Sequence, residues 1–349
     1  MYPDLPLWLS IVCVLGGLAV LAWSADTFVD GSSAVAKALG VSPFIIGMVI
    51  IGFGTSAPEL CVSAFSGATG HSDLSLGNAY GSCIFNIAVI LGVAALIKPI
   101  VVKPSVVFVA VPALVMIALL SCLLVTLGGG FSRLDGAILL GVFAVLLPAY
   151  CWFDQSQKRK SDSRDPGHDR RAPPLGEAAS RRFEVATSAT LPLWKGWLLL
   201  FVGLAFLVAS SHALVWGCVD LAREMGVSEL LIGLTVVAVG TSLPELASAV
   251  ASARKGEHEF VLGNIVGSNF FNTLAVVGLA GTISPFKDPS PYLLTRDLPV
   301  MVLMSVSIAV FGFNVRAPRE PKTVGRAAGA AWLLFFAVYM GLMLCQELK

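Results

Sequence analysis

Long apolar runs recur along nearly the whole chain, and they restrict it to folds that a lipid bilayer can hold. Hydrophobic residues make up 56% of the 349 and charged residues 13%, and the mean hydropathy is +0.83. A soluble protein of this length needs much more polar surface. Because about 20 apolar residues in an α-helix cross the hydrocarbon core of a membrane, the sequence predicts an all-α membrane protein.

Ten membrane-spanning helices are expected, five on each side of one long polar segment. We predict them at residues 7–29, 42–69, 73–97, 104–127, 133–152, 193–221, 228–253, 259–283, 293–314 and 326–345. The polar segment, residues 154–192, is rich in Pro, Gly, Ser and mixed charges and cannot bury an apolar core, so we expect a flexible linker. The linker divides the chain into two membrane regions, 1–153 and 193–349.

Basic residues predict the orientation of these helices. With the N-terminus outside, the connections on the inner side hold 18 of the 23 Lys and Arg residues, and those on the outer side hold 5. The positive-inside rule therefore predicts an outer N-terminus and a cytoplasmic linker. The net charge of +1, and the lack of a basic patch outside the linker, argue against a nucleic-acid partner.

The two halves contain copies of one repeat, offset by 186 residues. The segment GFGTSAPEL (52–60) aligns with AVGTSLPEL (238–246), and LGNAYGSCIFN (76–86) aligns with LGNIVGSNFFN (262–272). Without a gap, residues 40–92 and 226–278 share 21 identities in 53 positions, and these include Thr, Ser, Pro, Glu and Asn. Five spans per half place the second copy upside down. Such inverted repeats hold a substrate site near the middle of the membrane.

Each copy places one glutamate inside an otherwise apolar span, Glu59 in the first and Glu245 in the second. A charged residue at mid-bilayer costs about 2.5–3.5 kcal/mol on insertion scales, so such residues are rare without a function. A protonated carboxyl, hydrogen-bonded between helices, is the structural alternative. The recurrence of the glutamate in both copies, beside the same neighbours, favours a functional pair.

Hydroxyl groups and helix-breaking residues precede both glutamates. In each copy a Thr and a Ser lie about one helical turn before the Glu: Thr55 and Ser56, and Thr241 and Ser242. A proline directly before each Glu cannot bond the carbonyl four residues earlier: Pro58 with Gly54, and Pro244 with Gly240. We therefore predict broken helices in spans two and seven, with free carbonyls that face protein or a cavity. A packing kink is the alternative use of Pro and Gly.

Carboxylates, hydroxyls and free carbonyls are hard oxygen ligands, which suit Ca²⁺ or Na⁺ better than a thiophilic metal. The helix after each broken span extends this set with a Ser and an Asn spaced by four: Ser82 and Asn86, and Ser268 and Asn272. Such residues also serve as hydrogen-bonding contacts between helices. That alternative is strongest for Asn78 and Asn264, at the start of the same helices.

The motifs GTSAPEL with GNAYGSCIFN, and GTSLPEL with GNIVGSNFFN, resemble the two alpha-repeats of the sodium/calcium exchanger (cation/Ca²⁺ antiporter) superfamily in its bacterial form. The resemblance is strongest over 40–95 and 226–281 and extends to nearly the whole chain through the ten-span plan. It implies a transporter rather than an enzyme, in the inner membrane of a bacterium, with transported Ca²⁺ and Na⁺ and no cofactor. It also implies that the first and sixth helices slide past the rest of the molecule.

The resemblance further implies the cation ligands, with Glu59 and Glu245 shared by the Ca²⁺ and Na⁺ sites. The other implied ligands are the side chains of Thr55, Ser56, Ser82, Asn86, Thr241, Ser242, Ser268 and Asn272, and the carbonyls of Gly52 and Ala238. Two features depart from the family pattern. Cys83 replaces an Asn that Asn269 keeps. Several exchangers carry an Asp in one copy at the position of Asn86 or Asn272, whereas this chain has Asn in both.

The sequence thus predicts a cation antiporter that exchanges Ca²⁺ for Na⁺ by alternating access. A Ca²⁺/H⁺ antiporter of the same fold is the first alternative, and a requirement for Na⁺ separates the two. A cation channel is a weaker alternative, since a pair of inverted repeats favours alternating access. A membrane hydrolase built on His212 is disfavoured, because a helix points the neighbouring Ser210 and Ser211 in different directions.

Overall fold

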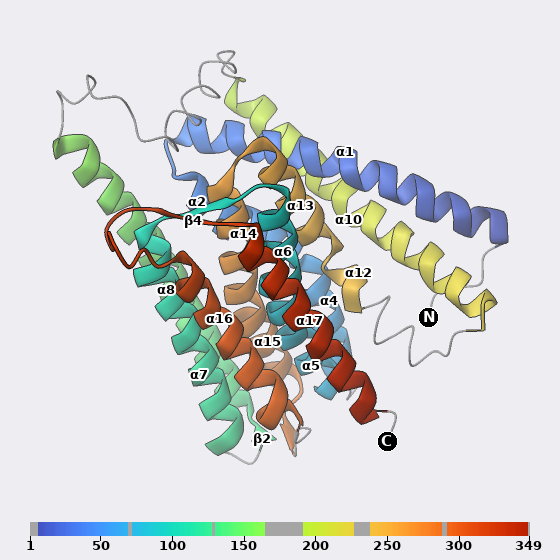
Figure 1. Cartoon of the computed structure of the whole chain (residues 1–349). Helices are drawn as coiled ribbons and strands as arrows, with labels where there is room; N and C mark the ends of the chain where they lie inside the picture. Colours follow the sequence, from blue (N-terminus) through green and yellow to red (C-terminus); the bar gives the residue numbers. More distant parts are fainter. Residues whose placement is uncertain are drawn as a thin grey trace.

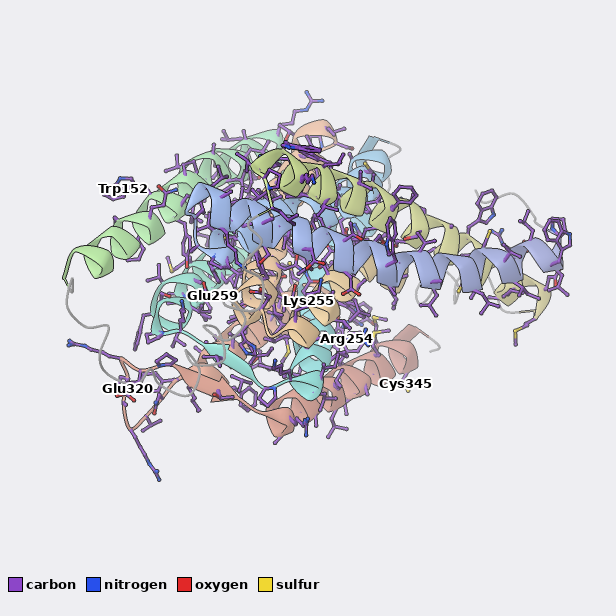
Figure 2. All side chains as sticks on the ribbon, turned by 90° about the horizontal axis from the view of Figure 1, so that it is seen from above. Trp152, Arg254, Lys255, Glu259, Glu320 and Cys345 are labelled. Atoms are coloured by element: carbon purple, nitrogen blue, oxygen red, sulfur yellow. The ribbon has the colours of Figure 1, made fainter. Side chains whose placement is uncertain are left out.

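The protein is almost entirely helical in the computed structural model, which describes residues 6–68, 72–127, 130–164, 191–226, 238–287 and 292–347. Figure 1 shows a bundle of helices with two long ones, α1 (Leu7–Leu39) and α10 (Leu193–Glu224), running together along its outside. Seen from above in Figure 2, this pair extends beyond the rest of the bundle on one side.

Many of the spans consist of successive short helices, because π-helical turns (labelled η) interrupt the α-helices. Before the polar segment, the elements after α1 are α2 (Pro43–Ile46), η1 (Gly47–Ile51), α3 (Gly52–Thr55), α4 (Ala57–Ala68), α5 (Ser72–Phe85), η2 (Asn86–Leu91), α6 (Gly92–Ile97), η3 (Val106–Ala110), α7 (Val111–Leu127) and α8 (Arg133–Arg164). After α10 come α12 (Ala238–Thr241), α13 (Leu243–Lys255), α14 (His258–Phe270), η5 (Phe271–Val276), α15 (Val277–Ile283), η6 (Leu293–Asp297), α16 (Leu298–Gly312) and α17 (Arg326–Glu347).

Eight helices among the described residues are long and apolar enough to cross a membrane. If the bent segment from α2 to α4, whose two parts meet at 43°, is counted as one span, the number is nine. The predicted span 228–253 falls partly outside the described residues, which omit 227–237, and its remainder forms α12 and α13. The prediction of an all-α membrane protein is confirmed.

Two helices continue past their predicted ends. α1 runs beyond residue 29 to Leu39, where Gly40 adopts a φ of 64° and caps the helix. α8 runs to Arg164, so the first part of the predicted linker is helical, and 165–190 lie outside the described residues. Gln, Lys and Arg are good helix formers, so they prolong a helix that has already started. The apolar pattern used for the prediction carries no signal for such extensions.

Glycines allow α1 and α10 to pack closely against each other along most of their length. A Cβ atom on Gly31 would lie 2.3 Å from the backbone nitrogen of Leu200. One on Gly203 would lie 2.5 Å from the backbone nitrogen of Phe28. Small residues have this role between membrane helices because they let the two backbones touch.

Polar contacts join both halves of α1 to other helices. In its first turns the Ser10 hydroxyl donates a hydrogen bond to the buried carboxylate of Asp220 on α10. In its second half Asp30 lies 2.8 Å from the ammonium group of Lys255, at the end of α13. Figure 2 shows Lys255 beneath α1, on the face that also carries Arg254 and Glu259. α1 is therefore tied both to its partner α10 and to the inner bundle.

Two short antiparallel ribbons join the halves of the chain at opposite ends of the bundle (Figure 1). β1 (Ile100–Val102) pairs with β4 (Lys322–Val324), and β2 (Gly130–Phe131) pairs with β3 (Phe286–Lys287). Each ribbon combines one strand that precedes the polar segment with one that follows it. The backbone therefore links the two halves directly at both ends of the bundle.

The two repeat copies meet at the centre, where α14 is almost wholly buried against α2, η1 and α3. A Cβ atom on Gly267 would lie 2.2 Å from the carbonyl oxygen of Met48, and one on Gly52 would lie 2.9 Å from the nitrogen of Ser268. The backbones of the two copies are thus in contact. Short polar side chains from one copy can consequently reach the other.

We expect Gly31→Ala to destabilise the protein, because the new methyl group would clash with the α10 backbone and force the helices apart. Overpacking of this kind costs about 1–3 kcal/mol. Gly16→Ala on the same helix is the matched control, since its added Cβ would meet no atom of another helix within 4 Å. Thermal unfolding of both purified variants in detergent measures the difference. Equal stability of the two variants would contradict the close packing of α1 on α10.

Candidate cation-binding site

Both broken spans break one turn before their glutamate, at the serine of the repeated motif. α3 ends at Thr55, Ser56 leaves the helix with φ −81° and ψ 5°, and α4 begins at Ala57. α12 likewise ends at Thr241, Ser242 has φ −92° and ψ 9°, and α13 begins at Leu243. The predicted breaks in spans two and seven are confirmed for the described residues.

The proline of each motif explains where the break falls. Pro58 and Pro244 are the second residues of α4 and α13, where a missing N–H does least harm. Each proline leaves the carbonyl four residues earlier without its helical donor. For Gly240 that carbonyl accepts a hydrogen bond from the Ser211 hydroxyl of α10 at 3.0 Å. A hydroxyl group from another helix thus replaces the lost backbone donor.

Ser211 was not among the predicted site residues, although two adjacent serines in an apolar span are a detectable signal. The carbonyl of Gly52 was predicted as a ligand, and it accepts hydrogen bonds from the Ser56 amide at 3.1 Å and the Ser268 hydroxyl at 3.5 Å. In the second copy the matching amide of Ser242 bonds Val239 instead, at 3.2 Å. The two breaks are therefore similar but not identical.

The two glutamates are fully buried, with exposed fractions of 0% for Glu59 and 1% for Glu245. Each accepts a hydrogen bond from the serine of the opposite copy. Ser242 donates to Glu59 Oε1 at 3.0 Å, and Ser56 donates to Glu245 Oε1 at 2.9 Å. The other carboxylate oxygen of each residue, Oε2, is buried without a hydrogen-bond partner. Two acceptor oxygens are thus left unsatisfied at the contact between the copies.

This crosswise arrangement corrects one expectation. Sequence spacing places the hydroxyls of Thr55 and Ser56 one turn before Glu59, within a single helix. The Ser56 hydroxyl instead donates a hydrogen bond to Glu245, and the Thr55 hydroxyl donates one to the Ile51 carbonyl at 2.9 Å. The helical register that the spacing assumes ends at Ser56. The serine side chain is consequently free to reach across to the other copy.

Asn264 connects several of the predicted site residues. Its Oδ1 accepts hydrogen bonds from Thr55 Oγ1 at 3.3 Å and Ser268 Oγ at 3.4 Å. Its Nδ2 donates to the Glu245 carbonyl at 3.3 Å and to Ser248 Oγ at 3.0 Å. Asn264 therefore acts as a contact between helices, which is the alternative that its sequence position left open.

The remaining predicted side chains lie in or near this network. Ser82 approaches the Ser242 hydroxyl at 3.3 Å. Asn86 donates to Asn269 Oδ1 at 3.0 Å, while its own Oδ1 has no partner. Asn272 is wholly buried with both amide atoms unpaired. The side chain of Ala238 lies outside the described residues.

The unpaired atoms of this centre include several hard oxygen acceptors. The buried atoms without partners include oxygens of two carboxylates and two amides. Among the described residues, no group of three or more His, Cys, Asp or Glu side chains is placed to hold a metal ion. Leaving buried oxygens unpaired is costly unless a donor or a cation satisfies them. The arrangement can therefore neutralise a bare cation with oxygen atoms from both copies.

The fold and the site together define a polytopic helical membrane protein with a carboxylate centre shared by two related halves. A family model described as sodium/calcium exchanger protein matches residues 9–151 and 195–345. The chain belongs to the sodium/calcium exchanger family.

Individual relatives match over almost their whole length. The chain is 36% identical over 334 residues to the putative antiporter CaxA of Alkalimonas amylolytica, covering 96% of this chain and 98% of the relative. It is 34% identical over 335 residues to the inner membrane protein YrbG of Escherichia coli K12, covering 95% and 96%. A structure of the sodium-calcium exchanger NCX_Mj, soaked with 100 mM Na⁺ and 10 mM Sr²⁺, matches with a TM-score of 0.77 at 27% identity, covering 96% and 99%.

We expect Asn264→Ala to cost more stability than Asn78→Ala at the matching position of the first copy. Asn264 is buried and uses both ends of its amide, whereas Asn78 is half-buried and donates to the Glu59 carbonyl and to Ser63. Each buried polar group that loses its partner costs about 1–3 kcal/mol. Thermal unfolding of the two variants in detergent measures the difference. A larger loss for Asn78→Ala would contradict this assignment.

Proposed function

We propose that the protein is a secondary active antiporter that exchanges Ca²⁺ for Na⁺ at the centre between Glu59 and Glu245. The main support is the pair of buried carboxylates. Each accepts a hydrogen bond from the opposite copy through one oxygen, while its second oxygen lacks a partner. A cation between the copies would satisfy both free oxygens at once. The protein would then be a carrier in which both halves are needed for binding.

Charge decides which cations suit this centre. Two ionised glutamates carry a charge of −2, which one Ca²⁺ or two Na⁺ neutralise. The same oxygens cannot bind one Ca²⁺ and two Na⁺ at once, so the two ions compete for the site, as an exchanger requires. Carboxylate, hydroxyl and amide oxygens are the ligands that hard cations prefer. Magnesium fits less well, because it gives up its water shell reluctantly.

The proposed ligand set follows the repeat. It comprises Glu59, Glu245, Ser56, Ser242, Ser82, Ser268, Thr55, Thr241, Asn86 and Asn272, with the carbonyls of Gly52 and Ala238. The names of the relatives agree with cation exchange, since one is a putative antiporter and one a sodium-calcium exchanger.

Alternating access completes the proposal. The ten spans form two inverted repeats of five, and the α1–α10 pair moves past the remaining helices. Support comes from the arrangement of that pair, which packs tightly on itself through glycines and lies along the outside of the bundle. The N-terminus is then outside, and the segment 154–192 lies in the cytoplasm of a cell whose inner membrane holds the protein.

A Ca²⁺/H⁺ antiporter is the second candidate, because the free oxygens of Glu59 and Glu245 can also accept protons. Proteoliposomes containing the purified protein separate the two. Ca²⁺ uptake driven by an imposed Na⁺ gradient at equal pH supports the Na⁺ exchanger. Uptake driven only by a pH gradient supports the proton antiporter. A cation channel would give flux without saturation or counter-transport, which would contradict both.

We predict that Glu59→Gln and Glu245→Gln each abolish Ca²⁺ transport while the protein still inserts into the membrane. Loss of half the neutralising charge costs a buried divalent ion several kcal/mol of binding, on the order of 3 or more at low dielectric. Glu259→Gln is the matched control, because that residue forms a partly exposed ion pair with Lys103. Initial rates of Ca²⁺ uptake in proteoliposomes measure the effect. Near wild-type transport by either central variant would refute the shared site.

The orientation has its own test. A cysteine introduced at Ser161, in the segment predicted to be cytoplasmic, should resist an impermeant maleimide in intact cells and react once the inner side is exposed. Lys287→Cys, on the predicted outer side, should react in intact cells. The unsubstituted chain gives the background from its own cysteines, of which Cys61 and Cys345 are exposed. Labelling at 161 from outside would reverse the proposed orientation.

A further inference from the structure

One of the buried positions at which the two repeat copies differ lies three residues before Asn86 in the first copy and three before Asn272 in the second. Position 83 is a cysteine in the first copy, and the equivalent position 269 is an asparagine in the second. Both side chains are buried, with exposed fractions of 0% and 2%. The difference therefore lies inside the centre that the copies share.

Asn269 anchors the neighbouring asparagine of the other copy. Its Oδ1 accepts a hydrogen bond from Asn86 Nδ2 at 3.0 Å, and its Nδ2 donates to the Cys83 carbonyl at 3.4 Å. The nitrogen end of the Asn86 amide is thereby fixed. Its oxygen end is left without a partner in the buried centre. Asn86 is thus held with its oxygen available for a ligand.

Cys83 reproduces only half of this arrangement. Its Sγ lies 3.9 Å from the Asn269 carbonyl and 3.6 Å from Thr273 Oγ1. The thiol therefore replaces the donor of an asparagine, but it offers only a weak acceptor. Asn272, the counterpart of Asn86, consequently has no side-chain oxygen to hold its nitrogen. Both of its amide atoms are unpaired although the residue is 0% exposed.

An amide without partners has no preferred orientation of its oxygen and nitrogen, because the hydrogen-bond network normally decides between them. A cation accepts only the oxygen. Binding must therefore turn Asn272 and hold it, whereas Asn86 is already held. The Asn86 side of the proposed cation site is thus preorganised, whereas the Asn272 side adjusts when the ion binds.

We propose that Cys83 is a positioning residue of the cation site, which leaves Asn272 unanchored so that this residue turns to meet the cation. The functional consequence rests on the proposed function: the protein binds the cation with lower affinity and releases it more easily. An asparagine at 83 would anchor Asn272 as Asn269 anchors Asn86. The smaller neighbour favours this exchange, because Cys83 contacts Thr273 where the other copy has the larger Ile87.

A double-mutant cycle without transported cations tests the anchoring by itself. Asn272→Ala is made in the wild-type chain and in Cys83→Asn, and thermal unfolding is followed in detergent with a chelator. We expect the melting temperature to fall by about 2 °C more in the Cys83→Asn background, where a hydrogen bond is lost. Equal falls in both backgrounds would overturn the proposal.

Transport tests the consequence. Compared with wild type, Cys83→Asn should lower the Ca²⁺ concentration for half-maximal uptake by about five-fold, since binding no longer has to order the amide. The maximal rate should not rise. Cys83→Ala lacks the acceptor oxygen, so it must not reproduce this change. An equal change in both variants would mean that volume, and not anchoring, matters at position 83.

A reciprocal variant covers the case in which Cys83→Asn does not fold. Asn269→Cys gives the second copy the arrangement of the first and removes the anchor of Asn86. It should raise the half-maximal Ca²⁺ concentration, and an unchanged value would overturn the proposal. If the wild-type protein moves no Ca²⁺ at all, the proposed function fails. The cation-free cycle still decides whether position 83 anchors Asn272.

Discussion

The crosswise hydrogen bonds between the repeat copies are the contacts on which the centre of the molecule depends. Ser56 of the first copy donates a hydrogen bond to Glu245 of the second, and Ser242 of the second donates one to Glu59 of the first. These bonds offset part of the desolvation and mutual repulsion that two buried, ionised carboxylates face. Glycines such as Gly267 make these bonds possible, because they bring the backbones close enough for short side chains to reach across. Neither half contains the whole of this carboxylate centre.

Much of the fold and of the site could be predicted from the sequence, because a repeat preserves residues that hydrophobicity alone would not. Apolar length predicted the spans, and Pro58 and Pro244 predicted the breaks. The partner of each serine could not be predicted. Spacing along a helix describes neighbours within one helix, whereas Ser56 lies where that helix stops. The choice of Glu245 over Glu59 depends on packing between segments nearly 190 residues apart.

Residues contributed by other helices were the hardest to recognise. Ser211 of α10 satisfies the Gly240 carbonyl, and although the adjacent serines mark the position as unusual, they do not indicate a partner in span seven. The extension of α8 to Arg164 was missed for another reason, since polar helix formers carry no apolar signal. Local sequence pattern thus identifies the structure and the chemical groups of each segment. Tertiary contacts determine which residues those groups bond.

The sequence separation of the central contacts has a consequence for synthesis. When the first half enters the membrane, Glu59 lacks its serine partner, because Ser242 lies 183 residues further along the chain. Ser10 and its partner Asp220 are separated by even more of the chain, 210 residues. Contacts between such distant segments form late, after slow closure of a long loop. The nascent first half must therefore hold the Glu59 carboxyl either neutral or solvated, and final assembly begins only when the second half is inserted.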